Sequence, residues 1–356
     1  MKVALVYDRV NKWGGAERVL LTLHEMFPDA PLYTSVYSPK NAPWAKVFPA
    51  VTPSFLQKIP FASTSHEYLA PLMPIAFESF NFDGYDLVIS VTSEAAKGIL
   101  TKQHTKHICY CLTPTRYLWS GYDFYLSYRS LERILAQPVV GYLRTWDKIA
   151  AQRPDVMVAI STAVKDRIKK YYGRDSAVIY PPATPALAWR AGPPVENGKY
   201  FLVVSRLVPY KRVALAIEAF NRLKLPLVVV GTGSEEGRLK EMAKPNIKFV
   251  GQLTEDKLHD YYKRCTALIM PQEEDFGLVA LEAQAAGKPV IAYKGGGAKD
   301  SILEGKTGIL FNQQTIKSLI EAIERFEKMK FDSKDCVENA ERFSSARFKK
   351  EFLKLI

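Results

Sequence analysis

Short runs of β-branched and other apolar residues alternate with segments of helical periodicity along most of the chain. Five runs precede the middle of the sequence, at 3–7, 87–90, 108–111, 156–160 and 178–180. Six follow it, at 201–204, 227–230, 247–250, 267–270, 290–292 and 309–311. Runs that are apolar at every position are typical of parallel strands buried on both faces. The alternation therefore predicts two doubly wound α/β domains in tandem.

A proline-rich segment divides the two halves. Residues 181–198 contain five prolines and two glycines, a density that neither a helix nor a central strand tolerates. We predict a first domain over 1–185, a linker over 186–199 and a second domain over 200–340. The segment 341–356 is expected to form a C-terminal helix, with Phe348 and Phe352 on one face.

Composition excludes several classes of protein. Four cysteines in 356 residues cannot form a disulfide scaffold, and no apolar run approaches the roughly 18–20 residues of a membrane-spanning helix. The start of the sequence lacks the pattern of a signal peptide, so we expect a cytoplasmic protein. The net charge of +12 is spread along the chain. It favours an anionic small ligand or a peripheral contact with an anionic membrane, and no nucleic-acid partner.

In parallel α/β sheets ligands bind beyond the carboxyl ends of the strands, so the loops that follow the apolar runs are the expected ligand sites. Gly14 and Gly15 follow the first run and open a helix, where backbone N–H groups can approach a phosphate. A tight turn without a ligand is the alternative. Neither the dinucleotide-binding nor the ATP-binding glycine motif is present.

A basic loop follows the run 201–204. Ser205 and Arg206 begin it and Lys211 lies near its end. An arginine and a lysine together can hold a diphosphate and stabilise it as a leaving group. A solvated basic loop is the alternative reading.

The segment 271–290 carries the strongest pattern. Glu274 lies in the loop before a helix that begins near Gly277, and Glu282 lies about one turn into that helix. Free N–H groups around Phe276, Gly277 and Leu278 favour an anion, and two carboxylates suit the hydroxyls of a sugar. A nucleotide sugar has both features. The glycines Gly231 and Gly233, and a further three at 295–297, also follow apolar runs and permit close approach of a ligand.

In their order along the chain, these motifs resemble glycosyltransferase family four. The resemblance covers essentially the whole chain, and Glu274-x7-Glu282 is its most specific part. The stretches 110–119, 168–174 and 203–212 resemble bacterial mannosyltransferases of O-antigen and exopolysaccharide assembly. Members of this family have the GT-B fold, in which two Rossmann-like domains face a cleft, and they are retaining enzymes.

The resemblance implies a role for each site residue. Arg206, Lys211 and Glu274 would be the catalytic residues, with the two cations neutralising the donor diphosphate and Glu274 binding the transferred sugar. Glu282 would bind the ribose. The other residues that would bind the nucleotide sugar are Gly14, Gly15, Ser205, Gly231, Gly233, Phe276, Gly277 and Leu278. The C-terminal helix would pack back on the first domain.

The resemblance has one departure, at Leu112. Related sequences often carry a histidine there, which is thought to contact the donor sugar. Thr113 and Arg116 are candidates for its role, and together with Tyr117 and Trp119 they form our predicted acceptor site. The aromatic residues from Tyr117 to Tyr128 would line an acceptor wall, whereas the apolar segment 55–82 is read as core packing, with a membrane-facing flap as the alternative.

We therefore expect a retaining, metal-independent transferase without a cofactor. It would move mannose from GDP-mannose to a hydroxyl of a glycan, most readily a lipid-linked one, on the inner face of the cell membrane. A UDP-sugar-dependent transferase, a nucleotide-sugar epimerase and a non-catalytic nucleotide-sugar-binding protein remain as alternatives.

Overall fold

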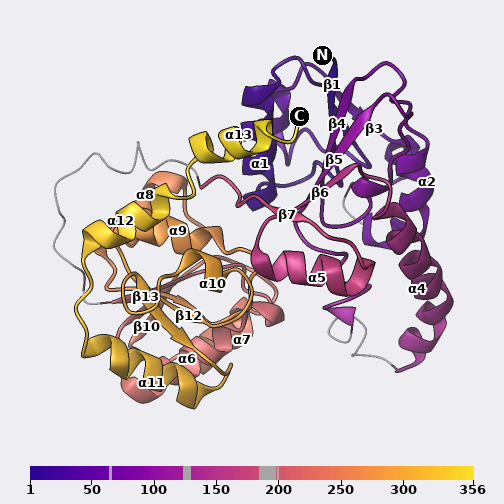
Figure 1. The fold of residues 1–356 in the computed structure, drawn as a ribbon. Helices are drawn as coiled ribbons and strands as arrows, with labels where there is room; N and C mark the ends of the chain where they lie inside the picture. The colour runs from indigo at the N-terminus through magenta and orange to yellow at the C-terminus, as the bar shows by residue number, and fades with distance from the viewer. Residues whose placement is uncertain (64–65, 123–129, 184–197, 199) are drawn as a thin grey trace. The chain divides into compact units, whose positions relative to one another are not determined.

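The computed structural model describes residues 1–63, 66–122, 130–183, 198 and 200–356. The predicted linker 186–199 lies almost wholly outside these residues. The described chain forms two compact units. Unit 1 comprises Met1–Tyr180 and Phe348–Ile356, and unit 2 comprises Pro181–Arg347. Each unit is built around one parallel sheet (Figure 1).

The sheet of unit 1 has the strand order β3-β2-β1-β4-β5-β6-β7, and neighbouring strands run parallel. Its strands are β1 (Val3–Tyr7), β2 (Leu32–Thr34), β3 (Val51–Pro53), β4 (Leu87–Thr92), β5 (Lys106–Cys111), β6 (Val156–Ala159) and β7 (Ala177–Val178). The apolar runs predicted five of them with small differences in bounds. Strands β2 and β3 were not predicted, because three residues are too few to show a period.

Helices cover both faces of this sheet. Helices α1 (Gly15–Met26) and α13 (Ser345–Leu353) lie on one face, and α2 (Met73–Glu78) and α4 (Ser130–Ala150) lie on the other (Figure 1). Helix α5 (Thr162–Tyr172) begins at Ser161, whose side chain accepts a hydrogen bond from the Val164 N–H, and ends at Gly173 in the left-handed conformation. Both ends of α5 follow the sequence signals for a helix start and stop.

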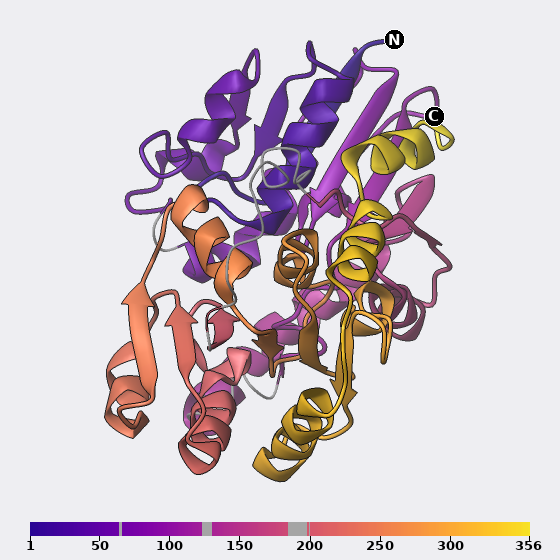
Figure 2. The same ribbon diagram turned by 90° about the vertical axis from the view of Figure 1, so that its left-hand side faces the viewer.

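Helix α13 completes the core of unit 1. Phe348 and Phe352 are buried, and both rings pack on Tyr110 of β5, with centroid distances of 5.6 and 6.5 Å. Lys349 pairs with Glu25 of α1 at 2.7 Å. Both views place α13, in yellow, beside the strands of unit 1 (Figures 1 and 2).

The segment 55–82 is only partly core. Its buried residues include Leu56, Met73, Phe77 and Phe82, which pack in the cluster that covers β1 and β4. Five of its large apolar side chains are exposed, namely Phe55, Phe61, Tyr68, Leu72 and Ile75.

The sheet of unit 2 has the order β10-β9-β8-β11-β12-β13, and it is also parallel. Its strands are β8 (Phe201–Val204), β9 (Leu227–Val230), β10 (Ile247–Gly251), β11 (Leu268–Met270), β12 (Val290–Tyr293) and β13 (Gly308–Phe311). All six strands were predicted from apolar runs. The two sheets confirm the predicted architecture of two Rossmann-like domains.

Two layers of helices cover the sheet of unit 2. Helices α6 (Val213–Leu223), α7 (Glu236–Met242) and α11 (Ile316–Glu327) lie on one face (Figure 1). The other face carries α8 (Glu255–Arg264), α9 (Leu278–Ala285), α10 (Ala298–Ser301) and α12 (Ser333–Glu341).

Candidate functional site

The strand order of unit 2 places β8 beside β11, although the chain continues from β8 to β9 on one side and from β11 to β12 on the other. The loops that leave β8 and β11 therefore diverge, and such a switch point is where open α/β sheets bind ligands. The loop after β8 carries Ser205, Arg206 and Lys211, and the loop after β11 carries Glu274. The fold thus brings two predicted motifs, far apart in the sequence, to one edge of the sheet.

Lys211 and Glu274 form an ion pair across these two loops. The Lys211 Nζ donates to Glu274 Oε1, and the side chains are 13% and 17% exposed. Gln272 is buried, and its Nε2 donates to the same oxygen at 2.9 Å. Between described residues both hydrogen bonds to this carboxylate go to Oε1, so Oε2 keeps its lone pairs for a hydroxyl group.

Arg206 lies near the start of the loop after β8, and its side chain is exposed. Its guanidinium contacts the Tyr210 hydroxyl and lies 5.9 Å from the centre of that ring, and Lys211 lies 5.2 Å from the ring on the same loop. Within the described parts of the chain no carboxylate pairs with Arg206. An exposed, unpaired guanidinium beside a lysine is suited to a phosphate.

Gly231 and Gly233 lie against the loop after β8. A Cβ at Gly231 would come within 1.9 Å of the Ser205 carbonyl oxygen, and one at Gly233 within 2.3 Å of the Leu207 carbonyl oxygen. Backbone hydrogen bonds from Ser205 N to Val230 O and from Leu207 N to Thr232 O accompany this approach. The two glycines therefore shape the loop that carries the cations; their contact with a ligand stays a prediction.

The glycines at 295–297 support the other loop in the same way. A Cβ at Gly296 would lie 1.8 Å from the Glu274 carbonyl oxygen, and Gly297 N donates to that oxygen at 2.9 Å. These contacts hold the backbone of Glu274 against the loop after β12. A side chain at Gly296 would displace the carboxylate from the switch point.

Helix α9 begins directly after the loop that follows β11 and carries Glu274. Gly277 precedes it with φ of 87°, a left-handed conformation that favours glycine, and Leu278 is its first residue. The Phe276 ring is buried against Phe343 at 5.6 Å, so only its backbone is available for the predicted sugar contact. Glu282 accepts a hydrogen bond of 2.8 Å from the Tyr262 hydroxyl of α8, which fixes one of its oxygens.

In unit 1, Gly14 and Gly15 begin α1, as predicted, with Gly14 extended at the N-cap. Glu17, in the first turn, is 1% exposed and accepts a hydrogen bond of 2.8 Å from the Tyr7 hydroxyl. Burial raises the pKa of the Glu17 carboxyl, and the hydrogen bond from Tyr7 partly opposes this rise. Glu17 could not be singled out from sequence alone, because acidic residues are common in the first turn of a helix.

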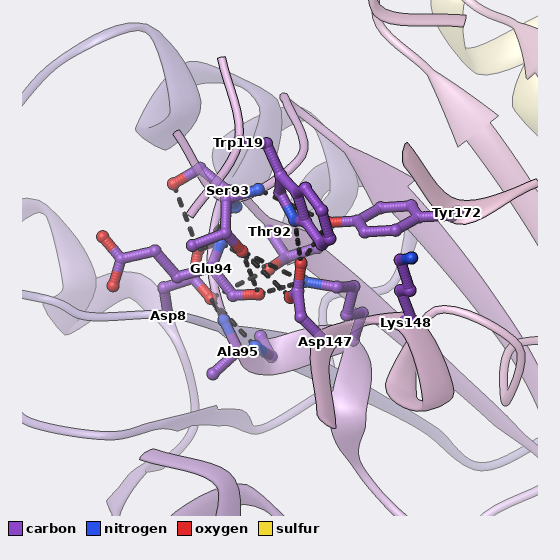
Figure 3. Close-up of polar contacts among 12 residues, drawn as sticks. Asp8, Thr92, Ser93, Glu94, Ala95, Trp119, Asp147, Lys148 and Tyr172 are labelled. Carbon is purple, nitrogen blue, oxygen red and sulfur yellow. Dashed lines mark hydrogen bonds and ion pairs between the residues drawn. The ribbon is translucent and has the colours of Figure 1, made fainter. Parts of the chain in front are cut away.

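Asp8, directly after β1, holds the loop that follows β4 (Figure 3). Its buried carboxylate accepts hydrogen bonds from four backbone N–H groups and from two hydroxyls, over 2.6 to 3.3 Å. The donors are Thr92, Ser93, Glu94, Ala95 and Ala96. Sequence reasoning missed this residue, although an aspartate directly after a buried strand was a usable signal.

Unit 1 has its own switch point, where β1 lies beside β4, and Arg9 and Glu94 form an ion pair of 2.7 Å there, between the loops after these two strands. Both side chains are less than one-fifth exposed. Burial raises the pKa of Glu94, although the Arg9 charge opposes the rise. This pair was also missed, because its members are 85 residues apart.

A second buried charge network lies below the predicted acceptor loop (Figure 3). Lys97 and Asp147 pair at 2.6 Å, and each is 1% exposed. The Asp147 carboxylate also accepts hydrogen bonds from the Thr115 hydroxyl, the Trp119 indole and the Tyr172 hydroxyl, at 3.0, 2.7 and 2.8 Å. One carboxylate thereby joins α4, α5 and the loop after β5.

The four predicted acceptor residues all lie on that loop. The hydroxyl of Thr113 is buried and has no hydrogen-bond partner among the described residues. Arg116, Tyr117 and Trp119 are partly exposed. Burial, followed by the charges of Glu94 and Asp147, raises the pKa of the Tyr117 hydroxyl. Of the other aromatics of the proposed wall, Tyr122 is described, and its ring centre lies 4.4 Å from the Arg144 guanidinium. Phe124, Tyr125 and Tyr128 lie outside the described residues.

Two further findings concern membranes and metals. None of the described helices combines the length and the apolar character that crossing a bilayer requires. In the described segments no group of three or more His, Cys, Asp or Glu side chains could hold a metal ion. The predicted absence of a metal and of a cofactor stays a prediction.

Comparison with known families gives one match, within unit 2. Residues 188–343 match the model of the family described as glycosyl transferases group 1. This range contains the loops after β8 and β11, with Arg206, Lys211, Glu274 and Glu282. The match supports the resemblance stated from the motifs.

Curated relatives are glycosyltransferases of varied specificity. An uncharacterized glycosyltransferase of Methanocaldococcus jannaschii is 25% identical over 206 residues, which cover 56% of this chain and 58% of that protein. A D-inositol 3-phosphate glycosyltransferase of Streptomyces bingchenggensis is 32% identical over 192 residues, or 44% of this chain and 41% of that protein. The chain spans about half the length of these curated relatives.

Solved structures extend the similarity to the whole fold. Anabaena Alr3699/HepE, in complex with UDP and glucose, has a TM-score of 0.70 and 21% identity, covering 100% of this chain and 99% of that chain. Sucrose-phosphate synthase from Thermosynechococcus elongatus has a TM-score of 0.73 and 17% identity, covering 100% and 98%. The chain therefore has the GT-B fold of these glycosyltransferases.

Proposed function

We propose that this chain, whose residues 188–343 match the glycosyl transferases group 1 family, is a retaining glycosyltransferase. It moves a hexose from a nucleotide sugar to a hydroxyl of a glycan. The single observation that supports this most is the arrangement of Arg206, Lys211 and Glu274 at the switch point of unit 2. Two cations and one half-satisfied carboxylate match a ligand that carries both a diphosphate and sugar hydroxyls.

In this mechanism the two cations act on the leaving group. As the bond between the sugar and the diphosphate breaks, negative charge grows on the departing phosphate, and Arg206 and Lys211 stabilise it. Glu274 Oε2 accepts a hydrogen bond from a hydroxyl of the transferred sugar, and Glu282 binds the ribose. The acceptor hydroxyl attacks from the face that the diphosphate leaves, and the departing phosphate takes its proton. The configuration at the anomeric carbon is therefore retained.

We propose mannose from GDP-mannose as the donor, on the resemblance of residues 110–119, 168–174 and 203–212 to bacterial mannosyltransferases. A UDP-sugar is the second candidate, because the structural neighbour HepE was solved with UDP and glucose. We further propose that unit 1 binds the acceptor, a lipid-linked glycan of a cell-surface polysaccharide, at the cytoplasmic face of the membrane.

A panel of GDP- and UDP-sugars in a thermal-shift assay tests the donor. A bound donor stabilises the folded state by mass action and so raises the melting temperature. At a donor concentration of a hundred times its Kd, the free energy of unfolding rises by about 2.7 kcal/mol. No shift with any nucleotide sugar would contradict the proposed function. A shift with UDP-sugars alone would replace the GDP-mannose assignment.

The variant Arg206→Ala tests the mechanism. We expect kcat to fall about 10²–10³-fold with a much smaller change in donor Kd, because Arg206 acts on charge that develops in the transition state. The matched control is Arg222→Ala, on the exposed surface of α6, which should leave both values unchanged. Equal losses of kcat and donor affinity in Arg206→Ala would argue against this role.

A further inference from the structure

Two partly exposed aromatic rings of unit 1 stack on each other. The rings of Trp119 and Tyr171 stack with centroids 5.3 Å apart and an interplanar angle of 24°. Trp119 belongs to the loop after β5 and Tyr171 to the last turn of α5. We call these two residues the Trp119 platform.

Three cations surround the platform. Arg144 and Lys148, one turn apart on α4, lie 5.5 and 5.4 Å from the centre of the Trp119 ring, and Lys170 lies 5.4 Å from the Tyr171 ring. Across the described ranges none of the three pairs with a carboxylate, whereas the adjacent Lys169 pairs with Asp175 at 2.9 Å. Three positive charges collected on one small surface repel one another, and an anion would relieve that repulsion.

Hydrogen bonds to buried groups fix the position of the Trp119 ring. The Trp119 Nε1 donates to the buried carboxylate of Asp147 at 2.7 Å, and Asp147 is fixed in turn by Lys97 (Figure 3). Among the described residues Arg144 makes one hydrogen bond, from its Nε to the Leu118 carbonyl oxygen at 2.7 Å, and its guanidinium lies 4.4 Å from the centre of the Tyr122 ring. This contact leaves its two terminal nitrogens for a ligand. Binding there costs little ordering of side chains, because the ring and the guanidinium are already placed.

The combination of one guanidinium and two ammonium groups indicates the ligand class. Arginine binds phosphate through two parallel hydrogen bonds, and lysine supplies point charges beside it. A carboxylate carries one charge and would leave two of the cations unsatisfied. A phosphate or diphosphate group carries enough charge and enough oxygens for all three.

We propose that the Trp119 platform, with Arg144, Lys148 and Lys170, binds a phosphate or diphosphate group of the acceptor. The inference rests on the proposed function and deepens it, since it makes the acceptor a saccharide joined to its carrier through phosphate. The same chemistry is present in the phosphate of a lipid headgroup, so the test must separate the two sources.

The test uses inorganic pyrophosphate as the probe, in isothermal titration of the full chain. The measurements are made in an Arg206→Ala background. This change weakens pyrophosphate binding at the loop after β8, because free pyrophosphate already carries the negative charge that Arg206 stabilises on the leaving group. Adding Lys148→Gln and Lys170→Gln should weaken pyrophosphate binding about tenfold, because two exposed cations each contribute up to about 1 kcal/mol. Both lysines are exposed, so the variant should keep the melting temperature of its parent.

The matched control carries Lys46→Gln and Lys58→Gln, which remove the same charge from exposed positions of unit 1 outside α4, α5 and the loop after β5. It should retain the pyrophosphate affinity of its parent. An equal loss in both double variants would overturn the proposal, because binding would then follow net charge. Arg144→Gln alone should also weaken binding, and an unchanged Kd in this variant would overturn the role given to the guanidinium.

Vesicles separate the two sources of phosphate. The same variants are tested for flotation with phosphatidylcholine vesicles, with and without phosphatidylglycerol. Loss of flotation in Lys148→Gln/Lys170→Gln with unchanged pyrophosphate binding would overturn the acceptor assignment in favour of a membrane surface. Donor binding is followed separately by thermal shift, so its failure would refute the proposed function without altering the pyrophosphate result.

Discussion

Replacing Asp147 by asparagine removes one charge from an ion pair that is almost fully withdrawn from solvent. Lys97 keeps hydrogen-bond acceptors in the Glu94 carbonyl and the Thr115 hydroxyl, but it loses the only carboxylate within ion-pair distance among the described residues. Breaking a buried pair from one side costs about 3–5 kcal/mol. For a unit of this size each kcal/mol lowers the melting temperature by about 2–4 °C. We therefore expect Asp147→Asn to melt on the order of 10 °C below the parent protein.

The pH dependence of the loss is a second signature. Burial lowers the pKa of Lys97, and the charge of Asp147 more than offsets this, so the net pKa lies above 10.5. Without the carboxylate, burial is the largest remaining influence on the Lys97 pKa, opposed by the smaller effects of Cys111 and Asp8. We therefore expect the folded-state pKa to fall below that of the unfolded chain. The unfolded state then binds more protons, and stability rises with pH. The cost of Asp147→Asn should therefore shrink as the pH is raised.

Urea unfolding, followed by tryptophan fluorescence, measures both effects. The control is Asp175→Asn, which breaks the Lys169–Asp175 pair, whose side chains are 59% and 88% exposed, and should cost less than about 1 kcal/mol. Lys97→Met combined with Asp147→Asn should cost less than the two single changes together. A loss below about 1 kcal/mol in Asp147→Asn, or strict additivity in the double variant, would refute the reasoning.

Three further variants, two of them with a matched control variant, test other parts of the fold by thermal melting. Gly231→Ala puts a Cβ 1.9 Å from the Ser205 carbonyl oxygen at a φ of 130° and should destabilise the fold by about 2–4 kcal/mol. Its control, Gly237→Ala, has nothing within 4 Å of the new Cβ and should stabilise α7 by about 0.5–1 kcal/mol. Similar effects of the two would contradict the packing argument. Burial raises the pKa of Glu17, so its ionised carboxylate lowers stability at neutral pH and Glu17→Gln should stabilise unit 1 there. This gain should vanish as the pH falls towards 4.5, because Glu17 is then protonated in the folded state. A gain that does not depend on pH would be inconsistent with this. Phe348→Ala should cost about 3–5 kcal/mol and Leu353→Ala, at an exposed site, less than about 0.5 kcal/mol, so equal losses would show that α13 does not complete the core.

The sheets and several helix ends could be predicted because they depend on neighbours in the sequence. The run Leu227–Val230 gave the bounds of β9, and α5 lies between Ser161 and Gly173, two residue types that are typical of a helix start and a helix end. Strands β2 and β3 were not predicted, because three residues are too few to show a period. Their conformation depends on pairing with β1 and with each other.

The candidate site could be predicted only in part. Positions after apolar runs identified Arg206, Lys211 and Glu274, and parallel sheet topology then brought them together. Asp8 also stands directly after an apolar run, but its partners could not be found from that position, since Asp8 meets its donors 84 to 88 residues away and local patterns carry no record of such pairs. The network around Asp147 could not be found for the same reason. Gly231 was read as a site for ligand approach, whereas its nearest neighbour in the structure is the loop after β8.

The position of α13 affects the order in which the chain can fold. Its residues Phe348 and Phe352 cover Tyr110, yet the whole sequence of unit 2 lies between that helix and the rest of unit 1. During synthesis, an apolar surface beside β5 stays open until the ribosome has translated unit 2. A fragment ending at Tyr180 would keep that surface exposed, so expressing unit 1 alone calls for a graft that restores residues 345–356.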